Sequence, residues 1–110
     1  MKDIEIKGWV ISHDVTVDYV GQAEGGIPNG WGNAQYLDGK LYDGEWKDGK
    51  FHGRGKEFYP DGTLEFEGEF KEGLRDGYGK AYLHDGKLIY EGKWKNGEQE
   101  GDKTAQTNWA

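Results

Sequence analysis

The chain has 110 residues, enough for one domain, and it contains no cysteine, which excludes disulfides and thiolate metal sites. Its 14 basic and 21 acidic side chains give a net charge of −7, which argues against attraction to nucleic acid or to an anionic membrane. Aromatic residues make up 15% of the chain, so we expect a folded protein with a thin core. The first residues lack the continuous apolar segment of a signal peptide, and we expect a soluble, cytoplasmic protein.

Residues 1–18 are predicted to form a cap strand, the second half of an incomplete repeat. Residues 8–14 precede Tyr19 in the way that residues 79–85 precede Tyr90, to within one residue. Ser12 and His13 fall in this predicted strand, where adjacent side chains point to opposite faces. A nucleophile and base pair is therefore not expected there.

From Tyr19 onward, one pattern of aromatic residues and glycines recurs. The copies open at Tyr19, Tyr42, Phe66 and Tyr90, at intervals of 23 or 24 residues. Three copies carry glycine at offsets +2, +7, +11 and +13 from the opening aromatic residue, and the fourth keeps the first three of these. A repeat of this length indicates one supersecondary unit stacked several times. The predicted repeats are 19–41, 42–65, 66–89 and the partial copy 90–101, followed by a tail or cap at 102–110.

Each copy is predicted to be a β-hairpin. Apolar or small residues alternate with charged ones over residues 42–47, so Tyr42, Gly44 and Trp46 share one face of a half-buried strand. A tight turn at Asp48-Gly49 follows, because Gly accepts positive φ and Asp tolerates it better than most residues. The equivalent turns are Glu72-Gly73 and Asn96-Gly97.

Glycines within the predicted strands are expected to leave room for aromatic rings. The expected pairs are Tyr42 and Trp46 over Gly53 and Gly55, and Phe66 and Phe70 over Gly77 and Gly79. The turn and packing glycines of this scheme are Gly49, Gly53, Gly55, Gly73, Gly77, Gly79 and Gly97. In the first copy Ala23 stands where later copies have Trp46, Phe70 and Trp94, so Trp9 or Trp31 would have to fill that space. Trp109 is a candidate cap residue at the other end.

One sequence pattern resembles the MORN (membrane occupation and recognition nexus) repeat, namely Tyr-x-Gly-x-Trp-Lys-x-Gly-x-x-x-Gly-x-Gly. The pattern is complete at residues 42–55 and is nearly repeated from Phe66 and from Tyr90. The resemblance covers roughly residues 19–101. It implies an all-β fold in which consecutive antiparallel hairpins form one twisted, curved, single-layer sheet with aromatic residues on one face. It also implies scaffolding, dimerisation, protein binding or lipid binding, which are the roles of this family.

The aromatic face is the main functional candidate. Nothing else in 110 residues is long enough to cover it completely, so we expect it to be partly core and partly recognition groove. Large aromatic side chains are good interface anchors. The candidate partner-binding residues are Tyr19, Tyr42, Trp46, Phe66, Phe70, Tyr90 and Trp94.

Motifs for catalysis or metal binding are weak. Residues 44–51 come within one residue of a phosphate-binding P-loop, but Phe51 replaces its Ser or Thr and no helix is predicted to follow. His13 and His84 fall at the same place in the repeat, just before a turn, and are expected to be solvated. No spacing matches a metal-ligand motif. We therefore expect no enzymatic activity, no metal and no cofactor.

The sequence favours a non-catalytic protein-binding or scaffold module that takes a peptide segment or helix of a partner in an aromatic-lined groove, with homodimerisation as a further option. The alternative is a small acidic inhibitor or decoy of a nucleic-acid-handling enzyme. A second alternative is an adaptor for anionic lipid, which the net charge opposes. Carboxylates clustered beside the groove would favour the decoy, and an even mixture of charges would favour peptide binding.

Overall fold

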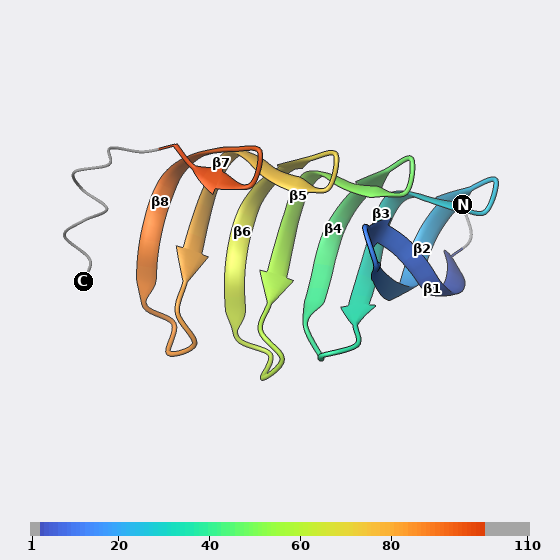
Figure 1. Ribbon diagram of the computed structural model, residues 1–110, viewed down its shortest axis with the longest axis horizontal. Helices are drawn as coiled ribbons and strands as arrows, with labels where there is room; N and C mark the ends of the chain where they lie inside the picture. The colour runs from blue at the N-terminus through green and yellow to red at the C-terminus, as the bar shows by residue number, and fades with distance from the viewer. Residues whose placement is uncertain (1–2, 101–110) are drawn as a thin grey trace.

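The computed structural model describes residues 3–100, which form a single nine-stranded sheet in which the strands follow sequence order (Figure 1). The strands are β1 (Asp3–Ser12), β2 (Val15–Glu24), β3 (Ile27–Tyr36), β4 (Leu41–Lys47), β5 (Lys50–Phe58), β6 (Leu64–Lys71), β7 (Leu74–Tyr82), β8 (Leu88–Lys95) and β9 (Glu98–Gln99). Each strand pairs antiparallel with the next, which confirms the predicted all-β series of hairpins. The predicted tail at 102–110, with Trp109, lies outside the described residues.

Two-residue turns join the strands at one end of the sheet, along the top of Figure 1. Asp48 and Gly49 have φ values of 51° and 84°, and positive φ at both positions is what a type I′ hairpin turn requires. Glu72-Gly73 and Asn96-Gly97 repeat this conformation, with φ values of 50° and 86° and of 50° and 87°. All three predicted turns are therefore present. At the other end, longer loops follow β3, β5 and β7, as at residues 59–63, where the Gly62 amide donates to the Tyr59 carbonyl at 2.9 Å.

A row of glycines crosses the sheet where its strands bend. The members of the row lie opposite one another on neighbouring strands and are, in order, Gly21, Gly32, Gly44, Gly55, Gly68, Gly79 and Gly92. A Cβ atom on Gly44 would lie only 2.5 Å from the Cα atom of Gly55, so any side chain at Gly44 would force the two strands apart. The sheet is therefore concave on the side to which these Cβ positions point. We call this side the inner face and the opposite side the outer face.

Aromatic side chains of the repeats fill the inner face and form the core. The Tyr42 ring packs edge-on against Trp46 of its own repeat at 5.6 Å and against Phe70 of the next repeat at 5.1 Å, and it stacks on Phe51 at 3.8 Å. Phe66 repeats the edge-on arrangement with Phe70 and Trp94. Such ring pairs contribute about 0.5–1.5 kcal/mol beyond the burial of their area. The curl thus lets a single sheet bury its own aromatic residues.

The glycines at offset +13 lie against rings, as predicted. A Cβ atom on Gly55 would come within 2.5 Å of the Tyr42 hydroxyl and 2.6 Å of its ring. On Gly79 it would lie 2.3 Å from the Phe66 ring and 3.3 Å from Trp94. These two positions are small because the rings occupy the space.

The glycines at offset +11 differ from the prediction. A Cβ atom on Gly53 would lie 1.9 Å from the carboxylate of Glu45, and one on Gly77 would lie 2.4 Å from that of Glu69, so the nearest side chain is a carboxylate and not a ring. Gly53 has a φ of 62°, next to a β-bulge in the pairing of β4 with β5. These glycines allow a carboxylate to approach the backbone.

The N-terminal strand adds an aromatic side chain, Trp9, to the core. Trp9 is partly buried against the core, and its indole Nε1 donates a hydrogen bond to the Gly49 carbonyl at 2.8 Å. The Gly49 amide in turn donates to Pro28, which pairs with Ala23. Of the two candidate tryptophans, Trp9 packs against the core, whereas Trp31 lies on the outer face with 56% of its surface exposed.

Candidate functional site

The candidate partner-binding residues of the sequence analysis come together on the inner face as parts of the core. Their exposures are Tyr19 0%, Tyr42 0%, Trp46 3%, Phe66 0%, Phe70 4%, Tyr90 8% and Trp94 5%. A direct contact between these side chains and a partner remains a prediction. In this conformation a partner could reach them only after the core opened.

Large exposed side chains gather instead on the outer face. Trp31, Arg54 and Tyr78 each stand between two glycines at offset +12 of three successive repeats. Trp31 is 56% exposed and Tyr78 is 49% exposed, and Arg54 is exposed as well. They lie on β3, β5 and β7, so the three form a row that crosses every second strand.

The backbone under this row is fixed by side chains of the preceding strands. The carboxylate of Glu45 accepts a hydrogen bond from the Arg54 amide at 2.6 Å, and that of Glu69 accepts one from the Tyr78 amide at 2.7 Å. In the first repeat the Gln22 side-chain oxygen accepts from the Trp31 amide at 2.8 Å. One acceptor at offset +3 thus holds each exposed residue at offset +12.

The register continues this row across the sheet. Trp31 lies opposite Glu45, and Arg54 lies opposite Glu69. Tyr78 lies opposite Lys93 of β8. Its hydroxyl donates a hydrogen bond to the Glu91 carboxylate of the same strand, which fixes the direction of the ring.

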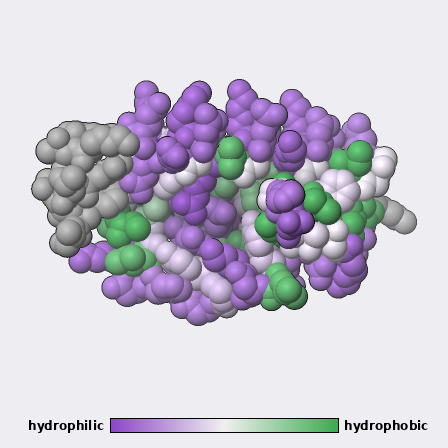
Figure 2. Space-filling view, in the orientation of Figure 1, coloured by the Kyte–Doolittle hydropathy of each residue, from purple (hydrophilic) through white to green (hydrophobic). Residues whose placement is uncertain are grey.

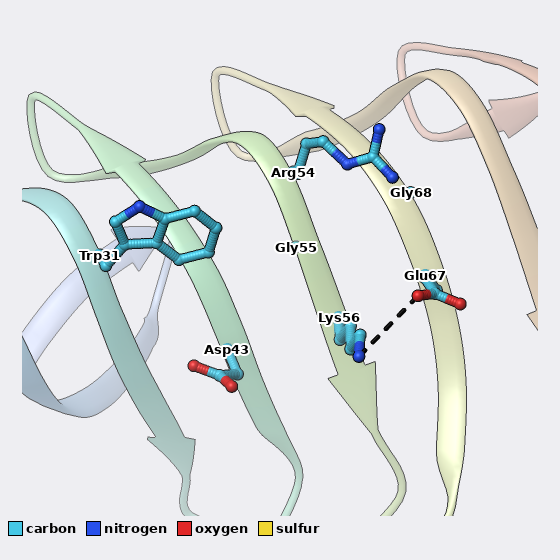
Figure 3. A pocket seen from close by; sticks show the side chains of 7 residues that line it. All are labelled: Trp31, Asp43, Arg54, Gly55, Lys56, Glu67 and Gly68. Carbon is cyan, nitrogen blue, oxygen red and sulfur yellow. Dashed lines mark ion pairs between the residues drawn. The ribbon is translucent and has the colours of Figure 1, made fainter.

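A second outer-face row runs parallel to the first and carries charges of alternating sign. The members of this row lie opposite one another on neighbouring strands and are Asp43, Lys56, Glu67, Lys80 and Glu91. Lys56 and Glu67 form an ion pair of 3.9 Å between Nζ and Oε2 (Figure 3). The carboxylates of this face are therefore interspersed with cations and do not cluster.

Between the two rows lies a shallow groove that we call the outer groove. It consists of two hollows of about 320 and 310 Å³, which share Arg54, Glu67 and Gly68. The Trp31 indole extends from β3 across β4, and the Arg54 side chain extends from β5 toward β6 (Figure 3). The first hollow is lined by Trp31, Asp43, Arg54, Gly55, Lys56, Glu67 and Gly68, and Glu69, Tyr78 and Lys80 join in the second. Glycine backbone at Gly55 and Gly68 thus forms part of its floor.

Arg75 forms ion pairs beside the aromatic core. Arg75 Nε lies 2.8 Å from Glu57 Oε1, and the guanidinium lies over the Phe66 ring at 4.3 Å from its centroid. Burial raises the pKa of Glu57 above its usual range, and the neighbouring Arg75 opposes that shift. The equivalent of Glu57 is Ala34 in the first repeat and Ala81 in the third. Arg75 Nη2 also lies 3.6 Å from Glu65 Oε2, so one guanidinium serves two carboxylates, and we regard these ion pairs as a local packing feature of the core.

The polar surface offers few groups for catalysis. His13 lies 3.3 Å from Asp14 and His84 lies 3.5 Å from Asp61, and both histidines are exposed, as expected. Within residues 3–100, no three His, Cys, Asp or Glu side chains are grouped so that they could hold a metal ion. The same residues include no helix with the length and apolarity needed to cross a membrane.

The outer row was not predicted from the sequence, although the sequence contains a signal for it. The residue between the two glycines faces away from the aromatic side by the alternation of the strand, and it is large in three successive copies. A large residue at this repeated outward position was the signal from which the row could have been found.

The family model of the MORN repeat matches residues 42–64, 66–87 and 90–101, which together are just over half of the chain. The chain belongs to the MORN repeat family. Residues 19–41 lie outside the matched segments, but β2 and β3 form the same hairpin as the MORN units that follow.

Part of this MORN sheet is also similar to a curated protein, phosphatidylinositol 4-phosphate 5-kinase 1 of Oryza sativa subsp. japonica. The two are 51% identical over 37 residues, which are 34% of this chain and 5% of the kinase. The chain thus matches only a small part of that protein's length.

Proposed function

We propose that this chain is a non-catalytic protein-binding or scaffold module that contacts its partner through the outer groove. The observation that carries the proposal is the exposed row of Trp31, Arg54 and Tyr78 at equivalent positions of successive repeats. Tyr, Trp and Arg are the residues most enriched among the energetic hot spots of interfaces. Their backbone is held in place by Gln22, Glu45 and Glu69, which reduces the entropy lost on binding.

The charge pattern beside the groove favours a protein ligand over the role of an acidic decoy. A decoy of a nucleic-acid-handling enzyme would present a continuous run of carboxylates to imitate phosphates. The row from Asp43 to Glu91 alternates in sign instead, and Lys56 and Glu67 neutralise each other. This even mixture is suited to a partner with polar groups of both signs.

The aromatic inner face supports this function by holding the sheet. Its burial keeps the outer row rigid across several strands, so a partner meets a preformed surface. Pairing with a second copy at the edge strand β1 would extend the same sheet, because an unpaired strand edge can accept another strand.

Binding of an anionic lipid is the second candidate. Lys47, Lys50, His52 and Lys71 surround a hollow of about 370 Å³ beside the tight turns, together with Asp48 and Glu72. Figure 2 shows mostly hydrophilic side chains along the upper rim, where these turns lie. The matched kinase has a phosphatidylinositol phosphate in its name, and its matched segment is a small part of it. Sedimentation with vesicles that contain anionic lipid tests this candidate in the wild type and in the Lys47→Ala/Lys71→Ala variant. Binding of the wild type that the double variant loses would support lipid binding. Failure of the wild type to sediment with the vesicles would reject it.

Affinity capture with matched variants tests the main proposal. Immobilised wild-type protein is compared with a Trp31→Ala/Arg54→Ala/Tyr78→Ala variant and with a control variant, Val10→Ala/Leu37→Ala/Leu83→Ala, whose residues are also exposed. Quantitative mass spectrometry should find proteins that the wild type and the control capture and the outer-row variant loses. Partners captured equally by all three folded proteins would show that the outer groove is not the binding surface.

A further inference from the structure

The spacing of the outer row sets the repeat distance of a ligand that could contact all three of its members. Neighbouring strands lie about 4.7–4.9 Å apart, so residues on every second strand are about 9.4–9.8 Å apart. Trp31, Arg54 and Tyr78 lie on β3, β5 and β7 and are joined in one line by the register and by the Glu45 and Glu69 hydrogen bonds. A ligand along the groove therefore meets one of these side chains about every 9.6 Å.

One backbone conformation of a peptide has almost the same repeat. A polyproline II helix has three residues per turn and rises about 3.1 Å per residue, or about 9.3 Å per turn. Residues i, i+3 and i+6 of such a segment lie on one side and span about 18.6 Å. An extended β-strand presents a residue to one side about every 6.6–6.8 Å, which does not match the row.

The chemistry of the row suits such a segment. Aromatic side chains that line a shallow groove are the usual contacts for proline rings, and the stiff ligand loses little entropy on binding. Trp31 and Tyr78 are exposed at the two ends of the row, and the Tyr78 ring is held by Glu91. Arg54, midway between them, forms no ion pair with any of residues 3–100, so it is available to a carboxylate of the ligand.

We propose that the outer groove binds a proline-rich segment of a partner protein in the polyproline II conformation. Prolines at positions i and i+6 pack against Trp31 and Tyr78, and an acidic residue at i+3 pairs with Arg54. The segment lies over the backbone of Gly55 and Gly68, which forms part of the groove floor. This inference rests on the proposed function, since it names the kind of protein segment that the module binds.

Synthetic peptides with the sequence pattern Pro-x-x-Glu-x-x-Pro test the inference, with binding to the full chain measured by calorimetry. A peptide of the same composition with its second proline at i+5 is the register control, and a helix-forming peptide with Trp, Glu and Leu at matched spacing is the conformational control. We expect binding of the first peptide at least ten times tighter than that of either control. Equal affinity for the two proline peptides, or tighter binding of the helical one, would overturn the proposal.

Variants of the chain locate the contact. Trp31→Ala and Tyr78→Ala should each weaken binding of the Pro-x-x-Glu-x-x-Pro peptide about tenfold or more, while Leu37→Ala, at an exposed loop residue, should leave it within twofold. The Arg54→Glu variant should not bind the peptide with Glu at i+3. It should bind a peptide that carries Lys at i+3 instead. Absence of this charge-swap rescue would contradict the assigned register, and self-association of the chain that depends on Trp31 would show that a second copy occupies the groove.

The outcomes separate this inference from the proposed function. If no proline peptide binds but affinity capture still finds a protein whose binding requires Trp31, the polyproline assignment is wrong and the protein-binding function stands. If neither peptides nor proteins bind, both are wrong.

Discussion

The side chain of Glu45 binds the backbone amide of Arg54 across the β4–β5 hairpin, with 2.6 Å between the carboxylate oxygen and the nitrogen. The carboxylate occupies the space that a side chain on Gly53 would need. Glu69 and Tyr78 repeat the arrangement one unit later. A residue on the outer face thus determines both the backbone conformation of its repeat and the place of an exposed side chain.

Removal of this acceptor should destabilise the hairpin. We expect Glu45→Ala to lower the free energy of unfolding by about 1 kcal/mol, the net value of one hydrogen bond. Glu45→Gln should lower the free energy of unfolding less, because an amide oxygen can accept the same hydrogen bond, as that of Gln22 does in the first repeat. Asp43→Ala, at an exposed position of the same strand, is the control, and urea denaturation measures all three. An equal effect of Asp43→Ala and Glu45→Ala would contradict this role.

Gly55 tests the packing of rings against the backbone. Gly55→Ala places a Cβ atom 2.5 Å from the Tyr42 hydroxyl, and Tyr42 is fully buried, so its ring has little space to move. We expect a loss of about 1–3 kcal/mol from overpacking, although Ala has a lower backbone entropy cost than Gly. Lys56→Ala, at the exposed neighbour, should change the denaturation midpoint far less. A higher midpoint for Gly55→Ala would show that the ring does not require this glycine.

Phe66 is the one opening aromatic residue without a hydroxyl, and this suggests a stabilising substitution. The Tyr42 hydroxyl donates to the Glu45 carbonyl at 2.7 Å, and that of Tyr90 donates to the Lys93 carbonyl at 2.9 Å. Phe66→Tyr should reach the equivalent carbonyl of Glu69 and gain about 0.5–1.5 kcal/mol. Phe70→Tyr would instead insert a hydroxyl among buried rings and should destabilise the protein. Thermal denaturation that ranks the two variants in the opposite order would refute this prediction.

Buried tyrosines should make the fold sensitive to alkali. Burial is the main cause that raises the pKa of Tyr19 to about 12 from its usual 10.0, and the nearby charge of Asp3 adds to the shift. The unfolded chain loses this proton first, so the stabilisation is complete below pH 10 and is lost as the pH rises toward 12. The free energy of unfolding should therefore fall less steeply over this range in Tyr19→Phe than in the wild type. Identical pH dependence of the two proteins would contradict the assignment.

The repeat pattern predicted the hairpins and their turns because the aromatic residues, glycines and Asp-Gly pairs each determine local backbone geometry. The curl of the sheet was harder to predict from the residues, since it arises where glycines such as Gly44 and Gly55 become cross-strand neighbours. Because of this curl, the Trp46 side chain is buried in the core. The role of Gly53 depends on the β-bulge and on the carboxylate of Glu45, and the alternation of residues reveals neither of them.

Solvent access to the tryptophan side chains tests the central claim most directly, namely that the aromatic inner face is the core and the outer face is open. The protein is labelled with fluorotryptophan, each fluorine resonance is assigned by a Trp→Phe substitution, and a soluble paramagnetic chelate is added. The Trp31 resonance should broaden strongly, because this side chain is 56% exposed, while those of Trp46 and Trp94, at 3% and 5%, should remain sharp. Broadening of Trp46 and Trp94 as strong as that of Trp31 would mean that the inner face is an open groove and would contradict the account.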